Sequence, residues 1–229
     1  MIENEYVAIL QHDTIKMRHP SNQNSIVTLY RIIATKSFAL EKFNKHIKKY
    51  DIGGYIESID NIDPTNPVWI DNSARVFDSA KILDGSYIRN VALIYENATV
   101  IGSEVADHCR VHGTTVIVDN SKILNLAEIR DGAEVKNSEI KKSSKISGNA
   151  KISDSVFTIA ASATGNCVVQ NSSISDVSEI RGTAIVNNCK YSGRVVRETG
   201  EWNNETIDKE IKLEIYEEVD ESTHSEYKI

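Results

Sequence analysis

The chain has 229 residues and a mass of 25.5 kDa, which is enough for one elongated domain or two small ones. Charged residues make up 26% of the chain and hydrophobic residues 40%, a composition that excludes a largely disordered protein. No apolar run is long enough to span a membrane, and the first residues lack the pattern of a secretory signal. The three cysteines are scattered and odd in number, which argues against a disulfide framework and favours a cytoplasmic location.

The net charge of −7 is distributed unevenly and suggests three regions. Residues 1–50 contain eight Lys or Arg against four Asp or Glu, residues 51–196 contain fourteen against eighteen, and residues 197–229 contain four against eleven. An acidic surface disfavours direct binding to a nucleic-acid backbone, because phosphates attract clustered cations. We therefore expect an N-terminal part, a central domain at 51–196 and an acidic C-terminal region at 197–229.

The N-terminal part, residues 1–50, begins with two expected strands. The segments EYVAILQHDTIKM and SIVTLYRIIATKSF are rich in strand-forming residues and are separated by the turn-rich HPSNQNS. The following ALEKFNKHIKK places Leu40, Phe43 and Ile47 on one face of a short helix. The pattern therefore predicts a β-hairpin followed by a short helix, and Gly53-Gly54 then lets the chain turn into the central domain.

The central domain is governed by a six-residue repeat of apolar residues with one-residue slips. Nineteen of its twenty-one anchor positions are Ile or Val. The series consists of Ile70, Val76, Ile82, Ile88, Ile94, Val100, Val105, Val111, Ile117, Ile123, Ile129, Val135, Ile140, Ile146, Ile152, Phe157, Ala163, Val168, Ile174, Ile180 and Val186. Two residues before nearly every anchor lies a small side chain such as Ala, Ser or Cys, and Asn166 is the exception.

This period fits neither an α-helix nor a simple alternating strand. It fits short strands joined by turns and wound into a solenoid, with the branched anchors pointing to the axis and the small residues packing where space is tight. Because a β-helix leaves open sheet edges at both ends, the N-terminal part is expected to act as a cap. Hexapeptide repeats are a known signature of β-helices.

The repeat resembles that of the hexapeptide-repeat superfamily, whose members form left-handed parallel β-helices. The resemblance implies an all-β fold with three hexads per coil and about six to seven coils. It extends to LYRIIATKSF, KKYDIGGYIESIDNID and VWIDNSARV, which are similar to the entry segments of bacterial and prophage-borne β-helix proteins usually described as acyltransferase-like. It covers about residues 28–190 and is specific for fold rather than for function.

The C-terminal region contains KEIKLEIYEEV, in which Ile211, Leu213 and Ile215 alternate with charged residues as in a half-buried strand. We expect this strand and the acidic tail to contact a partner protein or a second copy of the chain. The candidate partner-binding residues are Glu214, Glu217, Glu218, Asp220 and Glu221.

The candidate catalytic residues are His108 and His112, the only histidines within the repeat. In the acyltransferases of the superfamily a histidine acts as general base beside an acyl-coenzyme A bound between subunits, and an imidazole suits that role near neutral pH. The acidic C-terminal region would repel the polyanionic coenzyme. A carbonic anhydrase of the β-helical type would need three histidine ligands for zinc, whereas only two lie here, and Cys109 falls on an inward small-residue position, so we expect no metal site.

Two functions follow from these observations. The first is a non-catalytic, rigid interaction protein without a cofactor. The resemblance to prophage-borne proteins implies that a phage encodes it and that it binds and inhibits a protein of the bacterial host. The alternative is an acyltransferase that uses acetyl-CoA or another acyl-CoA, with His108 or His112 as general base. Both predict a homo-oligomer, a dimer or a trimer, because flat β-helix faces pack readily on symmetry mates.

Overall fold

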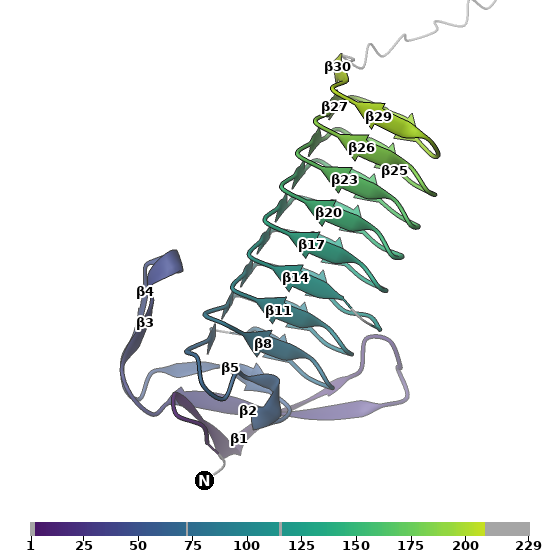
Figure 1. The fold of residues 1–229 in the computed structure, drawn as a ribbon. Coiled ribbons are helices and arrows are strands. Elements are labelled where there is room, and N and C mark those ends of the chain that lie inside the picture. Colours follow the sequence, from purple (N-terminus) through teal and green to yellow (C-terminus); the bar gives the residue numbers. More distant parts are fainter. Residues whose placement is uncertain (1–2, 72, 115, 209–229) are drawn as a thin grey trace, which may run out of the picture.

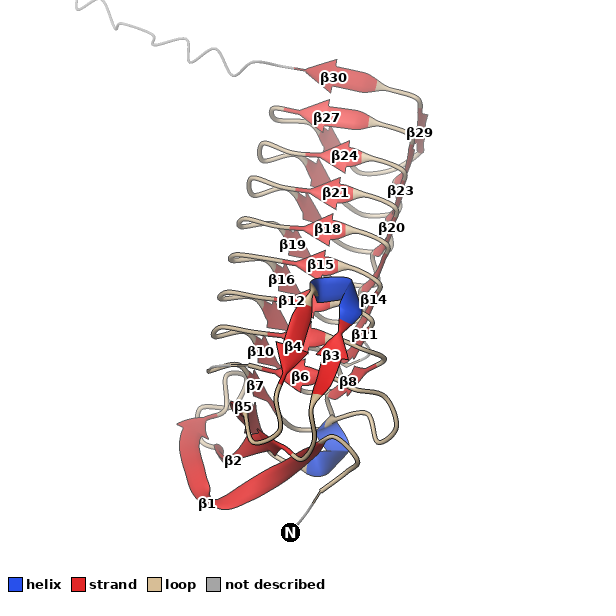
Figure 2. Ribbon diagram, turned by 90° about the vertical axis from the view of Figure 1, so that its left-hand side faces the viewer, coloured by secondary structure: helices blue, strands red, loops and turns tan. Residues whose placement is uncertain are grey.

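The computed structural model describes residues 3–71, 73–114 and 116–208 of the chain. Its main body is a parallel β-solenoid with three sheets, which we call faces 1, 2 and 3 (Figures 1 and 2). Among the described residues the helical elements are two three-residue 3-10 turns, and no described helix is long and apolar enough to cross a membrane.

Each face contributes one short strand to every coil, except that face 2 has only an isolated bridge, Ile62 to Ile82, in the first coil. Face 1 contains β5 (Ile52–Ile56), β7 (Arg75–Val76), β10 (Leu93–Ile94), β13 (Arg110–Val111), β16 (Glu128–Ile129), β19 (Lys145–Ile146), β22 (Ser162–Ala163), β25 (Glu179–Ile180) and β28 (Val196–Arg197). Face 2 contains β8 (Lys81–Leu83), β11 (Thr99–Ile101), β14 (Ile117–Asp119), β17 (Glu134–Lys136), β20 (Lys151–Ser153), β23 (Val168–Gln170), β26 (Ile185–Asn187) and β29 (Glu201–Asn203). Face 3 contains β6 (Trp69–Ile70), β9 (Tyr87–Ile88), β12 (Glu104–Val105), β15 (Lys122–Ile123), β18 (Glu139–Ile140), β21 (Val156–Phe157), β24 (Ser173–Ile174), β27 (Lys190–Ser192) and β30 (Thr206–Asp208).

The solenoid has about nine coils, more than the six to seven expected. Face 3 is a nine-stranded sheet, and face 1 also has nine strands once the antiparallel β1 and β2 are subtracted from its eleven. The additional coils lie at the two ends, where the spacing of the anchors or their residue type departs from the repeat. The first coil uses Ile56 and Ile62, and the last uses Trp202 and Ile207 after Tyr191.

Two anchors lie one residue later than the sequence pattern indicates. Val118, rather than Ile117, is fully buried and pairs with Val100 and Val135 of the neighbouring coils. In the same way Val169 replaces Val168 as the buried residue, and it pairs with Ile152. Because successive side chains of a strand point to opposite faces, Ile117 and Val168 therefore face outward.

The small-residue positions hold a buried ladder of hydroxyl groups. From Ser103 to Ser172, each serine donates to the carbonyl of the residue two positions earlier and accepts the N–H of its counterpart one coil later. The ladder therefore satisfies buried backbone groups at the corner between faces 2 and 3 while leaving room for the tight turn. It consists of Ser103, Ser121, Ser138, Ser155 and Ser172, and the next member is Cys189.

The corners turn with few glycines because Asn and Asp tolerate the left-handed conformation. At the corner between faces 2 and 3, φ is 47° at Asn120, 47° at Asn137, 50° at Asp154 and 46° at Asn171. The short polar side chains of these residues bond to their own ladder, as Asn120 Nδ2 does to Asn137 Oδ1 at 2.7 Å. A chain with 11 glycines can therefore make three turns in every coil.

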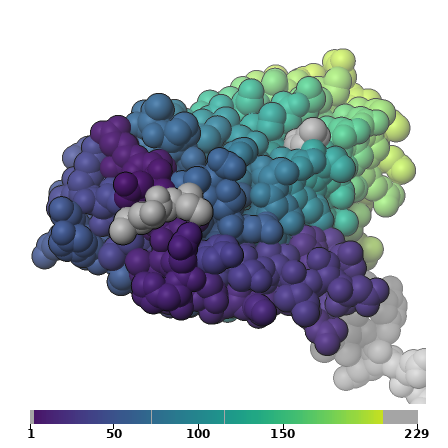
Figure 3. All heavy atoms as spheres, turned by 90° about the horizontal axis from the view of Figure 1, so that it is seen from below, coloured from purple at the N-terminus to yellow at the C-terminus, as the bar shows by residue number. Residues whose placement is uncertain are grey.

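The N-terminal residues form two antiparallel hairpins that lie against the solenoid. The first consists of β1 (Val7–Arg18) and β2 (Ile26–Ala34), and β2 pairs with β5, so face 1 continues into the hairpin. Figure 3, seen from below, shows the purple and blue N-terminal residues forming much of the near end of the molecule. The cap is therefore continuous with the sheet of face 1.

The second hairpin, of β3 (Phe38–Leu40) and β4 (Lys45–Ile47), replaces the helix expected at 39–49. A single 3-10 turn, η1 (Glu41–Phe43), connects its strands, and the second 3-10 turn, η2 (Ile59–Asn61), lies in the first coil. The helix prediction was wrong because tertiary packing overrides local propensity: Phe38 packs edge-on against Trp69 and Phe43 packs against Tyr87, over face 3 (Figure 2).

Candidate functional site

The hairpin β1–β2 lies across the outer surface of face 1 and buries a second apolar cluster there. Its members from the hairpin are Val27 and Leu29, and those from the solenoid are Tyr55, Phe77 and Tyr95. Phe77 and Tyr95 occupy the same outward position on adjacent coils and stack with ring centroids 5.1 Å apart. The hairpin thus keeps an aromatic row on face 1 away from water.

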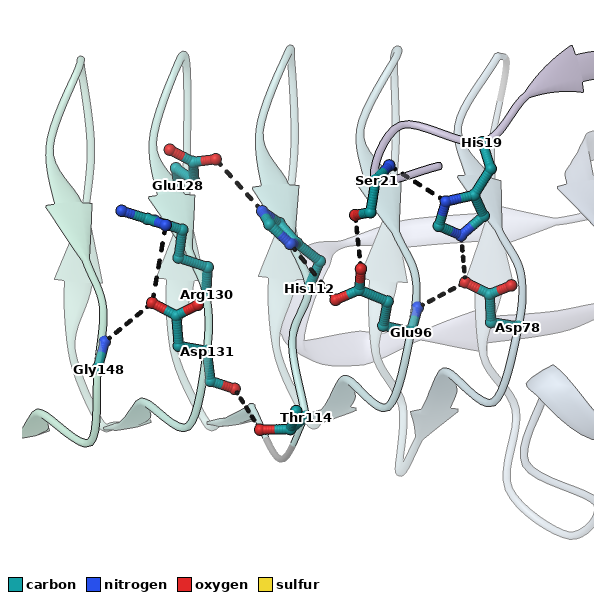
Figure 4. Close-up of polar contacts among 10 residues, drawn as sticks. All are labelled: His19, Ser21, Asp78, Glu96, His112, Thr114, Glu128, Arg130, Asp131 and Gly148. Atoms are coloured by element: carbon teal, nitrogen blue, oxygen red, sulfur yellow. Dashed lines mark hydrogen bonds and ion pairs between the residues drawn. The ribbon is translucent and has the colours of Figure 1, made fainter. Parts of the chain in front are cut away.

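The turn of this hairpin is attached to two solenoid carboxylates. His19 Nδ1 accepts the N–H of Ser21 at 3.1 Å, so the proton on Nε2 is donated to Asp78 Oδ2 at 2.8 Å. Ser21 Oγ donates to Glu96 Oε1 at 2.5 Å. The His19 ring also packs edge-on against both Phe77 and Tyr95. These contacts hold the hairpin turn against face 1 (Figure 4).

His112 continues the aromatic row one coil further, beyond the turn of the hairpin. Its ring stacks on Tyr95 with centroids 4.6 Å apart and planes 4° apart. Nε2 lies 3.2 Å from Glu128 Oε1 and Nδ1 lies 3.6 Å from Glu96 Oε2 (Figure 4). A carboxylate oxygen therefore lies near each ring nitrogen, one at hydrogen-bond distance and the other at ion-pair distance. Neither nitrogen is directed at open space where a substrate proton could be accepted.

His108 lies apart from this cluster, at the corner between faces 3 and 1. It is exposed, and its backbone N–H donates to the carbonyl of Asn125. It borders an open depression of about 320 Å³ that is also lined by Arg110, Leu126 and Glu128. Glu128 therefore contacts His112 and lines the same depression as His108, which is the more exposed of the two candidate histidines.

Burial raises the pKa of two other groups near these histidines. Burial, as the largest cause, raises the pKa of the Tyr95 hydroxyl, so this ring remains a neutral member of the stack. The Cys109 thiol is fully buried, and its desolvation raises its pKa to about 12. Cys109 is thus a packing residue on an inward small-residue position, as the repeat indicates, and is poorly suited to be a nucleophile or a metal ligand.

No group of three or more His, Cys, Asp or Glu side chains within the described residues could hold a metal ion. The tail residues that the sequence suggests for partner binding, Glu214, Glu217, Glu218, Asp220 and Glu221, lie outside the described residues, as does the expected strand at 209–219. The described part of the acidic region, residues 197–208, forms the last coil of the solenoid.

Sequence reasoning selected His112 but missed its partners. His19 and Ser21 come from a hairpin turn whose docking leaves no trace in the repeat, while Asp78, Glu96 and Glu128 look like ordinary solvated positions. One signal was present: Phe77, Tyr95 and His112 each directly follow an anchor, at Val76, Ile94 and Val111. Aligning the coils by their anchors places these three rings in one outward row.

In comparisons with known proteins, no family model matches the chain, and a search of curated proteins finds no match. The likeness to hexapeptide-repeat proteins therefore rests on the repeat itself and on the parallel β-helix that it forms.

Proposed function

We propose that the protein is a rigid, non-catalytic interaction protein whose solenoid docks a protein partner on face 2. The observation that carries this proposal is that the two described hairpins lie on faces 1 and 3, whereas face 2 is open from β8 to β29 (Figure 1). A continuous parallel sheet holds its outward side chains in fixed rows, so a partner meets a surface that needs no ordering on binding.

Face 2 carries apolar side chains that the solenoid core does not use. Ile117, Val168 and Ile185 occupy its first outward row and are half-buried. Between them Lys151 Nζ lies 3.5 Å from Glu134 Oε1 in an exposed ion pair. Apolar side chains grouped on a solvent-facing sheet and separated by charges are typical of a docking surface rather than of a solvated face.

A groove of about 490 Å³ borders face 2 at its corner with face 3. Lys42, at the tip of the β3–β4 hairpin, closes one end of it by contacting the Gly102 carbonyl and Asn120 Oδ1. The floor is formed by the corner residues, among them Asn137 and Asp154. This groove would give an extended segment of the partner a concave seat beside the flat face.

The finer form of the proposal names the partner as a host enzyme that the protein inhibits, and the protein as phage-encoded. Its support is the resemblance of the entry segment KKYDIGGYIESIDNID to prophage-borne proteins, together with the acidic C-terminal residues, which would attract a basic surface. Removal of residues 209–229 tests the electrostatic part, because the solenoid through Asp208 is retained. Partner binding that is undiminished and equally salt-dependent would exclude a role for this segment.

The docking face is tested by affinity capture from a bacterial lysate followed by titration of the identified partner. Ile117→Lys combined with Ile185→Lys should abolish binding without unfolding the protein, because both side chains face outward. Ser173→Lys, which adds a charge to face 3, is the matched control and should bind normally. A partner that binds the double variant as tightly as the unaltered protein would refute docking on face 2.

Acyl transfer is the second candidate, and the exposed position of His108 beside Arg110 is the observation that favours it. In this function Arg110 would attract the anionic acyl-CoA and His108 would accept the proton of the acceptor. A calorimetric titration with acetyl-CoA tests the idea directly. Saturable binding that is lost in His108→Ala but retained in His112→Ala would establish a cofactor site at this corner, and the absence of heat would exclude one.

A further inference from the structure

The corner between faces 3 and 1 carries exposed apolar side chains on several coils. We call Val91, Leu126, Ile159 and Val177 the corner row; their exposed fractions are 38%, 59%, 42% and 43%. Each lies in a turn between a face 3 strand and the next face 1 strand, and these turns are the loops at the left of the solenoid in Figure 2. The core of the solenoid makes no use of these side chains.

The backbone at this corner is unfavourable for two of them. Three earlier coils turn with left-handed Asn90, Asp107 and Asn125, which tolerate that conformation, and the coil just before Ile159 turns with left-handed Lys142. Ile159 and Val177 adopt it as well, with φ of 53° and 58°. A β-branched residue in the left-handed region is strained, and Asn or Gly would relieve the strain without any loss of buried contacts.

Exposure and strain therefore coincide at two positions of one corner, Ile159 and Val177. Either alone would be unremarkable in a solenoid, but together they mean that apolar side chains are present where folding would favour polar ones. Strained residues persist where a function requires them, and grouped exposed apolar residues mark a contact surface.

We propose that the corner row is the contact between two copies of this chain, packed side by side and antiparallel about a two-fold axis. Both copies have the same spacing of about 4.8 Å between coils, so each coil of one can face a coil of the other along the whole contact. A two-fold axis perpendicular to the solenoids also places face 1 of one copy beside face 1 of the other.

The charges next to the corner row select one register. On successive coils of face 1 the flanking residues are Arg110, Glu128, Lys145, Ser162 and Glu179. An axis between the coils of Glu128 and Lys145 sets each Glu128 opposite a Lys145 of the other copy. It also sets Val91 opposite Val177, and it brings Leu126 and Ile159 against the coils of Lys142 and His108. Moving the axis by half a coil in either direction would set Glu128 opposite Glu128 of the other chain, or Lys145 opposite Lys145. Like charges would then repel.

This contact goes beyond the docking proposal and does not depend on it. In a solenoid with three faces, the corner between faces 3 and 1 is opposite face 2. The dimer would therefore present both copies of face 2 outward. Failure of partner binding would leave the dimer untouched, and the reverse also holds.

Sedimentation of the full chain across micromolar concentrations tests the contact, and a reversible dimer is expected. Val177→Asn and Ile159→Asn should each weaken dimerisation about tenfold while the thermal unfolding temperature rises or stays the same, because Asn relieves the strain. Gln170→Asn, on face 2, is the control and should leave the dimer intact. A chain that is monomeric throughout, or dimers unaffected by both Asn variants, would overturn the proposal.

Disulfide trapping tests the antiparallel register, since the three native cysteines are buried. Val91→Cys with Val177→Cys in one chain should yield a covalent dimer on mild oxidation. Neither single variant should form a disulfide-linked dimer, because position 91 of one chain lies opposite position 177 of the other. Coupling of the single variants would show a parallel pairing and overturn the antiparallel one.

Discussion

The first and last described coils differ in how the three-sheet stack is built at its two ends. At the N-terminal end, face 1 continues into the antiparallel strands β2 and β1, which then fold over its outer surface. At the C-terminal end Arg197 takes an anchor position, pairing with Ile180 of the coil below. One end extends the hydrogen-bonded sheet and buries more apolar surface, while the other turns a charged residue inward, which deters edge-to-edge addition.

The charged C-terminal end is internally compensated. The Arg197 guanidinium lies 4.1 Å from the centre of the Trp202 ring, and its Nη2 contacts both carboxylate oxygens of Glu205, at 2.8 and 2.9 Å. Tyr191 Oη donates to the same carboxylate at 2.6 Å. The hydrogen bonds from Tyr191 and Arg197 lower the pKa of Glu205, and burial together with Glu205 raises that of Tyr191. Within the described residues the Arg197–Glu205 ion pair thus lies against Trp202 at this end, and we expect this end to be the weaker one.

The largest expected effect is a loss of stability at the N-terminal end of the solenoid. Phe77→Ala removes a fully buried ring from beneath the hairpin and should cost about 3–5 kcal/mol of unfolding free energy. Hydrogen exchange should show lost protection in β1 and β2 while β23 and β26 stay protected, since coils of a solenoid interact mainly with their neighbours. Phe77→Leu is the milder control. Equal loss of protection along the whole solenoid would mean that the hairpin and the coils unfold as one unit.

A smaller effect at the same end is a loss of folding stability at low pH, caused by protonation of Asp63. Burial by itself raises the pKa of this carboxyl, but the N–H groups of Asn66, Thr65 and Asp84 outweigh it and hold the pKa at about 2. Because the folded pKa lies below the usual value, the stabilisation is complete above about pH 4 and is lost as the pH falls towards 2; it amounts to about 2 kcal/mol.

Urea unfolding at a series of pH values measures the contribution of Asp63. Asp63→Asn should lower stability near neutral pH and flatten the decline between about pH 4 and pH 2. Asp60→Asn, on the exposed 3-10 turn, is the control. If Asp63→Asn keeps the full decline of unfolding free energy at low pH, other carboxylates cause that decline.

At the C-terminal end, Arg197→Ala should cost about 1–2 kcal/mol, because Glu205 loses both charge-assisted hydrogen bonds and Trp202 loses its covering cation. The loss should appear in the hydrogen exchange of β26 and β27 and not in β1. Arg197→Leu with Glu205→Gln should recover part of the stability yet promote end-to-end association, which light scattering would detect. Unchanged exchange in β26 would show that the ion pair does not secure this end.

The contrast between the ends also explains how far the sequence could predict the structure. The interior coils were predictable because Ile, Val and small residues recur at fixed positions, but their serines proved to satisfy backbone groups as well as to save space. The ends were predictable only in part: the β1–β2 hairpin was expected and is confirmed. The last coil and the β3–β4 hairpin were not, because Arg197 and Trp202 break the anchor pattern and rings of face 3 stabilise the hairpin. His112 was visible in the repeat, whereas His19 and Glu96 are joined by a docked hairpin that no periodicity encodes.

The smallest expected effect is a difference in the alkylation rates of two native thiols, one in the middle of the solenoid and one at its weaker end. Cys109 lies deep in the stack, where burial raises its pKa to about 12, while Cys189 lies directly beneath the last coil and contacts the Trp202 carbonyl. Alkylation requires a thiolate and access, so both should resist iodoacetamide in the native protein. If the C-terminal end frays first, Cys189 should be alkylated in low urea well before Cys109, and Arg197→Ala should accelerate only Cys189. Mass spectrometry of the labelled peptides separates the two sites. Simultaneous labelling of both thiols would show that the solenoid opens as a whole and that its C-terminal end is as stable as its middle.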